Sequence, residues 1–208
     1  MNTLKIHWLR IVVHLGVWIP LAVIIFDAFT NHLGIDPIRE TILRTGKTAL
    51  TLLILSLACT PANSLFGFRQ ALTVRRALGL YAFMYAAFHF IVFVGVDYGF
   101  DASLLGDAIF EKPYALVGFA TFLILVPIAI TSTKGWMKRL GQLWKRLHQG
   151  IYIAVLFAIV HFVWLVKLDV REPLTYGAIV IALLALRLTP VRHLITHIRN
   201  QSNKIPAT

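Results

Sequence analysis

Long apolar runs alternate with short polar segments along the whole chain. Six runs approach the ~20 residues that a helix needs to cross the hydrocarbon of a bilayer. They cover about residues 9–27, 47–66, 77–96, 113–131, 149–166 and 173–189. The second run is interrupted at Thr60–Pro61, and the sixth is short at its apolar centre. The pattern predicts an all-α membrane protein, with one bundle of six transmembrane helices filling residues 1–208 as a single domain.

Basic and acidic residues are distributed unevenly between the segments that join these runs. With the N-terminus placed in the cytoplasm, the cytoplasmic segments hold 14 of the 20 Lys and Arg residues: two near the N-terminus, three in 67–76, five in 132–148 and four from residue 187 on. All nine Asp and Glu residues fall at the opposite ends or in the opposite loops. An excess of Lys and Arg on the cytoplasmic side is the regularity that sets membrane topology. We therefore expect both termini to be cytoplasmic.

The overall composition fits this class and narrows the partners. The chain is 58% hydrophobic and 14% charged, against roughly 25% charged residues in a soluble domain. Cytoplasmic segments that face anionic membrane lipid explain the net charge of +11, so we do not infer nucleic-acid binding. Residues 133–148 carry apolar residues at helical spacing between bases, which predicts an interfacial helix on the inner leaflet. The single cysteine, Cys59, excludes an internal disulfide, and no internal repeat is evident.

Two histidines carry the candidate chemistry, because ionisable residues inside membrane helices are functional candidates. His89 lies 13 residues after Arg76 and His161 lies 15 residues after Arg146. At ~1.5 Å per residue both are expected ~20–22 Å from the inner boundary, on two helices that cross in the same direction. Two imidazoles at one depth can hold the iron of a flat macrocycle between them, and bonds to iron make burial of the rings favourable. Phenylalanine and alanine residues flank both histidines.

A simpler interpretation exists for each histidine taken alone. A buried imidazole can bond a serine, a threonine or a backbone carbonyl on a neighbouring helix, with no cofactor present. A metal ion without a macrocycle is disfavoured, because no Cys, Asp or Glu is expected at that depth to complete four ligands.

His148 is placed differently, 13 residues before His161 and so ~20 Å nearer the inner face. The matching level on the third run holds Arg75, which cannot be a ligand because it stays protonated; His14 on the first run could serve instead. His148 could ligate a second cofactor, donate to a haem propionate, line a flavin or quinone site, or face water. Arg75 and Arg76 could neutralise propionates or a flavin phosphate, or act as positive-inside anchors.

Several motifs resemble a known family. The blocks RRALGLYAFMYAAFHF (75–90) and ITSTKGWMKRLGQLWKRLHQGIYIAVLFAIVHFVW (130–164) resemble the ferric-reductase-type transmembrane domain, a six-helix family in which histidines on the third and fifth helices hold haem b. Four shorter motifs resemble the MsrQ (YedZ) family within it: DPIRE (36–40), TGKTAL (45–50), RRALGL (75–80) and TSTK (131–134). Two-haem relatives have a second histidine low on the third helix, where this chain has arginines.

This resemblance implies a multi-pass electron-transfer subunit of the bacterial inner membrane. It implies haem b, with a second haem possible, and bound FMN. It also implies a periplasmic molybdopterin partner, MsrP, which reduces methionine sulfoxide in oxidised periplasmic proteins with electrons from the quinone pool. His89, His148 and His161 match the histidines that the family associates with haem.

The residues also bear on the electron donor and on the competing class of protein. No GxGxxG motif occurs, so we expect the chain not to use NAD(P)H by itself but to need a quinol or a flavin reductase. The acidic loop 97–111 is a candidate docking surface for the outer partner.

The alternative to an electron-transfer protein is a transporter or structural membrane subunit, which would use buried charge pairs or broken helices at the midplane. The break at Thr60–Pro61 is the one interruption of that kind in the sequence.

Overall fold

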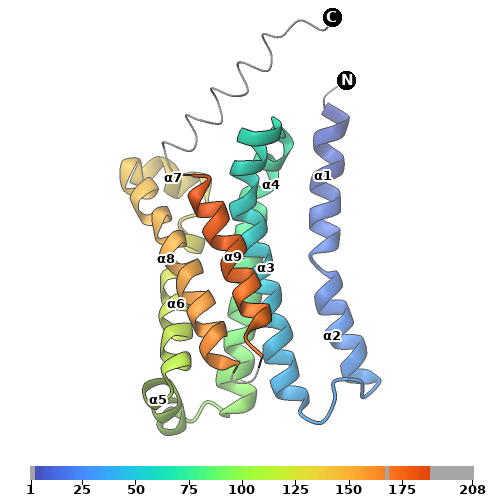
Figure 1. The fold of residues 1–208 in the computed structure, drawn as a ribbon, viewed down its shortest axis with the longest axis vertical. Helices are drawn as coiled ribbons and strands as arrows, with labels where there is room; N and C mark the ends of the chain where they lie inside the picture. The colour runs from blue at the N-terminus through green and yellow to red at the C-terminus, as the bar shows by residue number, and fades with distance from the viewer. Residues whose placement is uncertain (1–2, 167–168, 188–208) are drawn as a thin grey trace, which may run out of the picture.

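The computed structural model describes residues 3–166 and 169–187, and every regular element in these ranges is a helix. The elements are α1 (Thr3–Gly16), α2 (Ile19–Phe29), α3 (Pro37–Phe66), α4 (Arg69–Ile91), the π-helix η1 (Val92–Asp97), α5 (Ala102–Glu111), α6 (Pro113–Ile130), α7 (Lys134–Leu140), α8 (Gln142–Leu165) and α9 (Arg171–Ala185). Figure 1 shows the long helices side by side, with α5 at one end of the bundle and α7 at the other. We call these the α5 end and the α7 end.

Within the described residues, five helical stretches are long and apolar enough to cross a membrane, as expected of a multi-pass membrane protein. They are Trp8–Phe29, Pro37–Phe66, Arg69–Asp97, Pro113–Ile130 and Gln142–Leu165. The sixth predicted run corresponds to α9, whose 15 residues fall short of the ~20 needed to span. Residues 188 and 189 of that run lie outside the described residues.

The helix predicted from the second apolar run, 47–66, differs from the observed helix α3 in two respects. Helix α3 begins at Pro37, about three turns before the apolar run, because the Asp36 carboxylate accepts a hydrogen bond from Arg39 N at 3.0 Å and so caps the helix. The helix also continues through Pro61 to Phe66 instead of breaking. Proline removes the N–H that would bond the Leu57 carbonyl, and Arg187 Nη2 donates to that carbonyl at 2.5 Å instead.

The first predicted run forms two helices rather than one. The fully buried Tyr85 of α4 places its hydroxyl between the backbone groups of α1 and α2. This hydroxyl donates to Val17 O at 2.6 Å and accepts from Leu21 N at 3.2 Å. In a continuous helix Leu21 N would donate directly to Val17 O. An inserted side chain of this kind is a known cause of helix kinks, and it explains the interruption between Gly16 and Ile19.

Two predictions about the segments outside the spans also need correction. The interfacial helix expected over 133–148 is limited to α7, because Gly141 turns the chain with φ +52 and the residues from Gln142 on belong to α8. The acidic segment 97–111 is not a loop throughout but contains α5. Asp101 caps α5 by accepting hydrogen bonds from Ser103 N at 2.9 Å and Leu104 N at 3.1 Å.

Two antiparallel hairpins, α3–α4 and α6–α8, form the body of the bundle. Helix α1 packs on α4, and α9 packs on α8 and α3 (Figure 1). The core where these elements meet includes Leu53, Leu57, Tyr85, Val155 and Val180. At the α5 end, ion pairs join three helices: Arg44 to Asp27 and to Glu40 (2.8 Å), and Lys47 to Glu172 (2.7 Å).

Candidate functional site

His89 of α4 and His161 of α8 lie side by side inside the bundle. Their ring centroids are 6.2 Å apart and their ring planes are nearly perpendicular, at 87°. The two histidines come from different hairpins, and the helices that carry them run in the same direction. The two rings thus lie at the same depth in the bundle, as expected, with their centroids 6.2 Å apart.

A backbone carbonyl of the neighbouring helix fixes each ring. Nδ1–H of His89 donates to Ile42 O of α3 at 2.8 Å, and Nδ1–H of His161 donates to Tyr114 O of α6 at 2.6 Å. A carbonyl can only accept, so these bonds place the proton on Nδ1 and leave Nε2 with a free lone pair. The cofactor-free interpretation of each histidine therefore accounts for one ring nitrogen and leaves the other available to a metal. Metal-binding histidines are commonly oriented in this way.

Two glycines make room for the imidazoles. A Cβ atom on Gly46 would stand 3.1 Å from Cε1 and Nδ1 of His89. One on Gly118 would stand 2.7 Å from Nδ1 and 2.8 Å from Cε1 of His161. Optimal contacts between such atoms are about 3.5–4.0 Å, so any larger residue would push the ring away. The sequence analysis missed both glycines, although Gly46 stands in the quoted TGKTAL motif.

The two hairpins hold their histidines in the same way. In each, 47 residues separate the accepting carbonyl from the histidine, and the glycine lies one helical turn after that carbonyl. Ile42, Gly46 and His89 thus correspond to Tyr114, Gly118 and His161. The correspondence lies in a few contact positions and not in the intervening residues, so it is compatible with a sequence in which no internal repeat is evident.

The spacing of the two rings suits a metal between them. A bond of about 2.0–2.1 Å from imidazole nitrogen to metal on each side, with about 1.1 Å from each nitrogen to its ring centre, gives about 6.2 Å between the centres. The observed separation is 6.2 Å. Among the described residues no group of three or more His, Cys, Asp or Glu could hold a metal ion. Two axial imidazoles therefore fit a haem, whose macrocycle supplies the other four nitrogens, better than they fit a bare ion.

Aromatic residues wall the site on the α4–α6 side. Phe90 stacks on Phe122 with centroids 4.6 Å apart, and Phe83 stacks on the same ring at 5.9 Å. Near His161, Phe162 is buried, whereas Trp164 is half exposed. The rings of Phe83 and Phe90 on α4 therefore pack together with Phe122, whereas Trp164 lies at the bundle surface.

His148 lies apart from this pair, near the start of α8. Its ring stacks on Trp144 with centroids 3.9 Å apart, and Nδ1–H donates to Trp144 O at 3.0 Å. Nε2 lies 3.3 Å from Ser132 Oγ, but the single Ser132 hydrogen already reaches Ile128 O at 2.7 Å. His148 thus also presents an Nε2 lone pair, at the α7 end of the bundle.

The remaining candidate residues do not join one site. His14 of α1 contacts Tyr81 of α4, with Nδ1 2.6 Å from the hydroxyl oxygen. Helices α1 and α8 stand on opposite sides of the bundle (Figure 1), so the structure does not bring His14 next to His148. Arg75 donates to Thr60 Oγ1 at 3.1 Å, and Arg76 is exposed.

Comparisons with known proteins place this geometry in a class. Residues 45–159 match the family described as ferric reductase like transmembrane component. The match includes Gly46, His89 and His148 and stops two residues before His161. The class is therefore that of ferric-reductase-like membrane domains.

Curated relatives narrow the class further. A protein of Xanthomonas axonopodis pv. citri (strain 306) is 42% identical over 184 residues, covering 86% of this chain and 84% of the relative. One of Caulobacter vibrioides is 38% identical over 176 residues, covering 84% of each. Both are named "Protein-methionine-sulfoxide reductase heme-binding subunit MsrQ". No solved structure matches the chain. The chain belongs to the MsrQ family of ferric-reductase-like membrane proteins.

Proposed function

We propose that this protein is the haem-binding membrane subunit of a protein-methionine-sulfoxide reductase, and that His89 and His161 are the axial ligands of its haem b. The observation that carries the assignment is the 6.2 Å separation of two imidazoles whose Nδ1 atoms are both held by carbonyls. The names of the relatives support the cofactor and the reductase system. When bound, the haem supplies a one-electron carrier inside the membrane.

The protein's own residues hold the ligands in place before the cofactor binds. The Ile42 and Tyr114 carbonyls fix the ring orientation and keep the proton on Nδ1. The hydrogen bonds also raise the basicity of Nε2 towards iron. Gly46 and Gly118 let both rings lie close to the neighbouring helices, and the rings of Phe83 and Phe90 stack on Phe122 between α4 and α6.

Electrons would enter at the α7 end and leave at the α5 end. His148 and its free Nε2 are suited to an inner site, either beside a quinol or flavin or as the ligand of a second haem. We propose that the donor is a membrane quinol or a cytoplasmic flavin reductase. FMN would also bind at the α7 end, where Arg75 and Arg76 are available. The role of His14 stays a sequence-based prediction.

The charge distribution supports the proposed topology, and the resemblance to the MsrQ family supports the proposed partner. We propose six spans within a single domain, with α9 as part of the sixth, both termini in the cytoplasm and the protein in the bacterial inner membrane among its lipids. The α7 end carries most of the basic residues, as the positive-inside rule requires of the cytoplasmic side. The periplasmic partner would be the molybdopterin protein MsrP, docking on the acidic α5 end.

A visible absorption spectrum of the detergent-purified protein tests the proposal. We expect a Soret band that shifts on reduction with dithionite, and haem that can be extracted by acidic solvent. His89→Ala and His161→Ala should each lose the bis-histidine spectrum while still inserting in the membrane. Full haem content in a normally inserted His161→Ala protein would rule out the ligand assignment, and a wild-type protein with no haem would rule out the function.

A further inference from the structure

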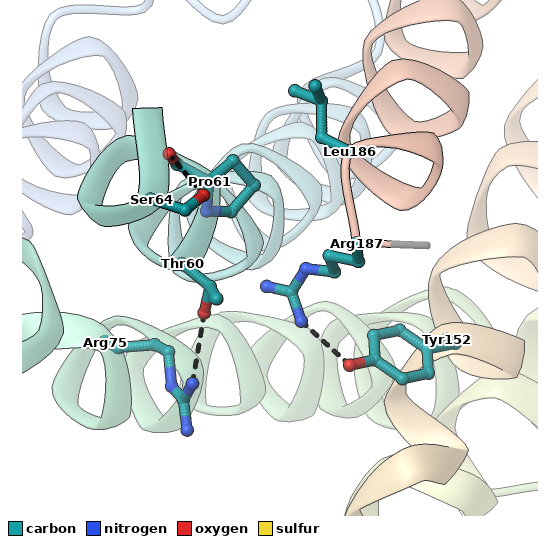
Figure 2. A pocket seen from close by; sticks show the side chains of 7 residues that line it. All are labelled: Thr60, Pro61, Ser64, Arg75, Tyr152, Leu186 and Arg187. Atoms are coloured by element: carbon teal, nitrogen blue, oxygen red, sulfur yellow. Dashed lines mark hydrogen bonds between the residues drawn. The ribbon is translucent and has the colours of Figure 1, made fainter. Parts of the chain in front are cut away.

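A polar cavity of about 210 Å³ opens at the α7 end, away from the His89–His161 pair. Figure 2 shows the side chains of Arg75 from α4 and Arg187 from beyond the end of α9 approaching it from different sides. Thr60 of α3 and Tyr152 of α8 stand beside them. Three helices and the segment after α9 therefore contribute to one small polar space in a bundle that is otherwise mostly apolar.

The Arg187 guanidinium is held firmly. Its Nη2 donates to Leu57 O at 2.5 Å, and its Nη1 donates to the Tyr152 hydroxyl at 2.8 Å. The guanidinium also lies over the Tyr152 ring, with Cζ 5.4 Å from the centroid. The carbonyl is free to accept because Pro61 has no N–H to donate to it. The proline therefore creates the acceptor that fixes this arginine.

Hydrogen-bond donors of the two guanidinium groups remain available in the cavity. Arg187 Nε is buried and has no hydrogen-bond partner among the described residues. A buried donor without a partner is costly. Arg75 uses Nη1 on Thr60 Oγ1, and its side chain is otherwise exposed towards the cavity mouth. A ligand that accepts several hydrogen bonds would satisfy these donors.

Among the described residues, no carboxylate forms an ion pair with Arg75 or Arg187. Every side-chain contact that holds Arg75 and Arg187 is with a neutral oxygen or a ring. The nine acidic residues of the whole sequence fall in 27–40, 97–111 and 169–172, segments at the α5 end. There, Arg44 and Lys47 are ion-paired. A partly buried cation such as Arg187 is stabilised by a counter-charge, and a bound anion would supply that charge.

We propose that the cavity between Arg75 and Arg187 binds a phosphate group. Guanidinium groups match the oxygen atoms of phosphate in geometry and charge. The phosphate can come from the headgroup of an anionic phospholipid or from a soluble phosphate ester, since the cavity lies at the end of the bundle. The site is separate from the haem ligands and does not depend on their assignment.

The experiment uses the purified full-length protein and measures its melting temperature with two probes. Inorganic phosphate is titrated against chloride at equal ionic strength, and nanodiscs of phosphatidylcholine are compared with nanodiscs that also contain phosphatidylglycerol. We expect at least one probe to raise Tm. Arg187→Gln and Arg75→Gln should lower the apparent affinity for that probe by roughly tenfold or more. Arg69→Gln, which removes the same charge from an exposed position outside the cavity, should respond like the wild type.

The outcomes separate the sources and can overturn the proposal. A response to phosphate identifies a soluble ester as the source, and a response to phosphatidylglycerol alone identifies lipid. No response to either probe, or an equal loss in Arg69→Gln and the cavity variants, overturns the proposal. If Arg187→Gln does not fold, Arg75→Gln decides, because Arg75 makes one side-chain hydrogen bond, to Thr60 Oγ1, and is not needed to hold helices together.

Discussion

His161 lies so close to Gly118 that a Cβ at residue 118 would stand 2.7 Å from Nδ1 of the imidazole. The Tyr114 carbonyl, one turn earlier on the same helix, holds that nitrogen at 2.6 Å. The ring therefore cannot turn away from an added methyl group without breaking its hydrogen bond. The orientation of the His161 ring therefore depends on the absence of a side chain at Gly118 as well as on the hydrogen bond to Tyr114.

Replacing Gly118 by Ala is expected to displace the His161 ring. We predict a loss of about 1–3 kcal/mol in the free energy of unfolding, as for other overpacked cores, together with reduced haem content. Gly46→Ala should have a smaller effect, since its Cβ would stand 3.1 Å from the His89 ring. Denaturation in detergent and haem quantitation on the same samples measure both effects.

The matched control is Gly106→Ala, a helical glycine with open space around its Cβ position. It should leave haem content unchanged and alter stability by no more than about 1 kcal/mol. Wild-type stability and full haem in Gly118→Ala would show that the ring tolerates the contact.

Replacing Tyr85 by Phe tests the interruption between α1 and α2. The change removes a buried hydroxyl that serves both Val17 O and Leu21 N, so we expect a loss of about 1–3 kcal/mol in stability. Tyr176→Phe is the control, because its hydroxyl makes one exposed contact, 3.2 Å from Thr51 Oγ1. Equal thermal shifts for the two variants would mean that the Tyr85 hydroxyl is not what stabilises the kink.

Replacing His148 by Ala is expected to leave the haem between His89 and His161 in place but to slow its reduction by the physiological donor. The reason is that His148 lies near the start of α8 and makes its hydrogen-bond contacts with Trp144 and Ser132, not with either ligand. Haem stoichiometry and stopped-flow reduction on one preparation check both parts. Complete haem loss in His148→Ala alongside full retention in His161→Ala would reverse the assignments.

The absence of a nucleotide-binding motif predicts that NADH alone does not reduce the haem of the pure protein. Reduction should require an added quinol or a flavin reductase with NADH. Absorbance at the reduced haem band, followed after each addition, gives the answer, and rapid reduction by NADH without another component would contradict it.

The sequence predicts the helical class and the proximity of the two histidines for a simple physical reason. Distance from a charged boundary measures depth in a membrane helix, and depth decides which residues of parallel helices can meet. This argument alone pairs His89 with His161, and the structure places their ring centroids 6.2 Å apart.

Other features depend on which helix packs against which, and no local pattern reveals that. Pro61 follows a local rule that predicts a break, but Arg187 from a distant segment satisfies the carbonyl that the proline leaves free. The sequence does not distinguish Tyr85 from an ordinary core residue, because its role depends on the backbone of another part of the chain. Gly46 and Gly118 are informative only once the neighbouring ring is known.

The two hairpins hold their histidines by the same kinds of contact, and this affects how the protein can be assembled. Helices α3 and α4 orient one ligand entirely within the residues before Lys112, and α6 and α8 orient the other within the residues after it. A chain cut between Glu111 and Pro113 keeps both orienting hydrogen bonds intact. Two separately translated fragments would therefore each carry one oriented histidine, and a haem bound by both histidines, as proposed above, would join the fragments in the membrane.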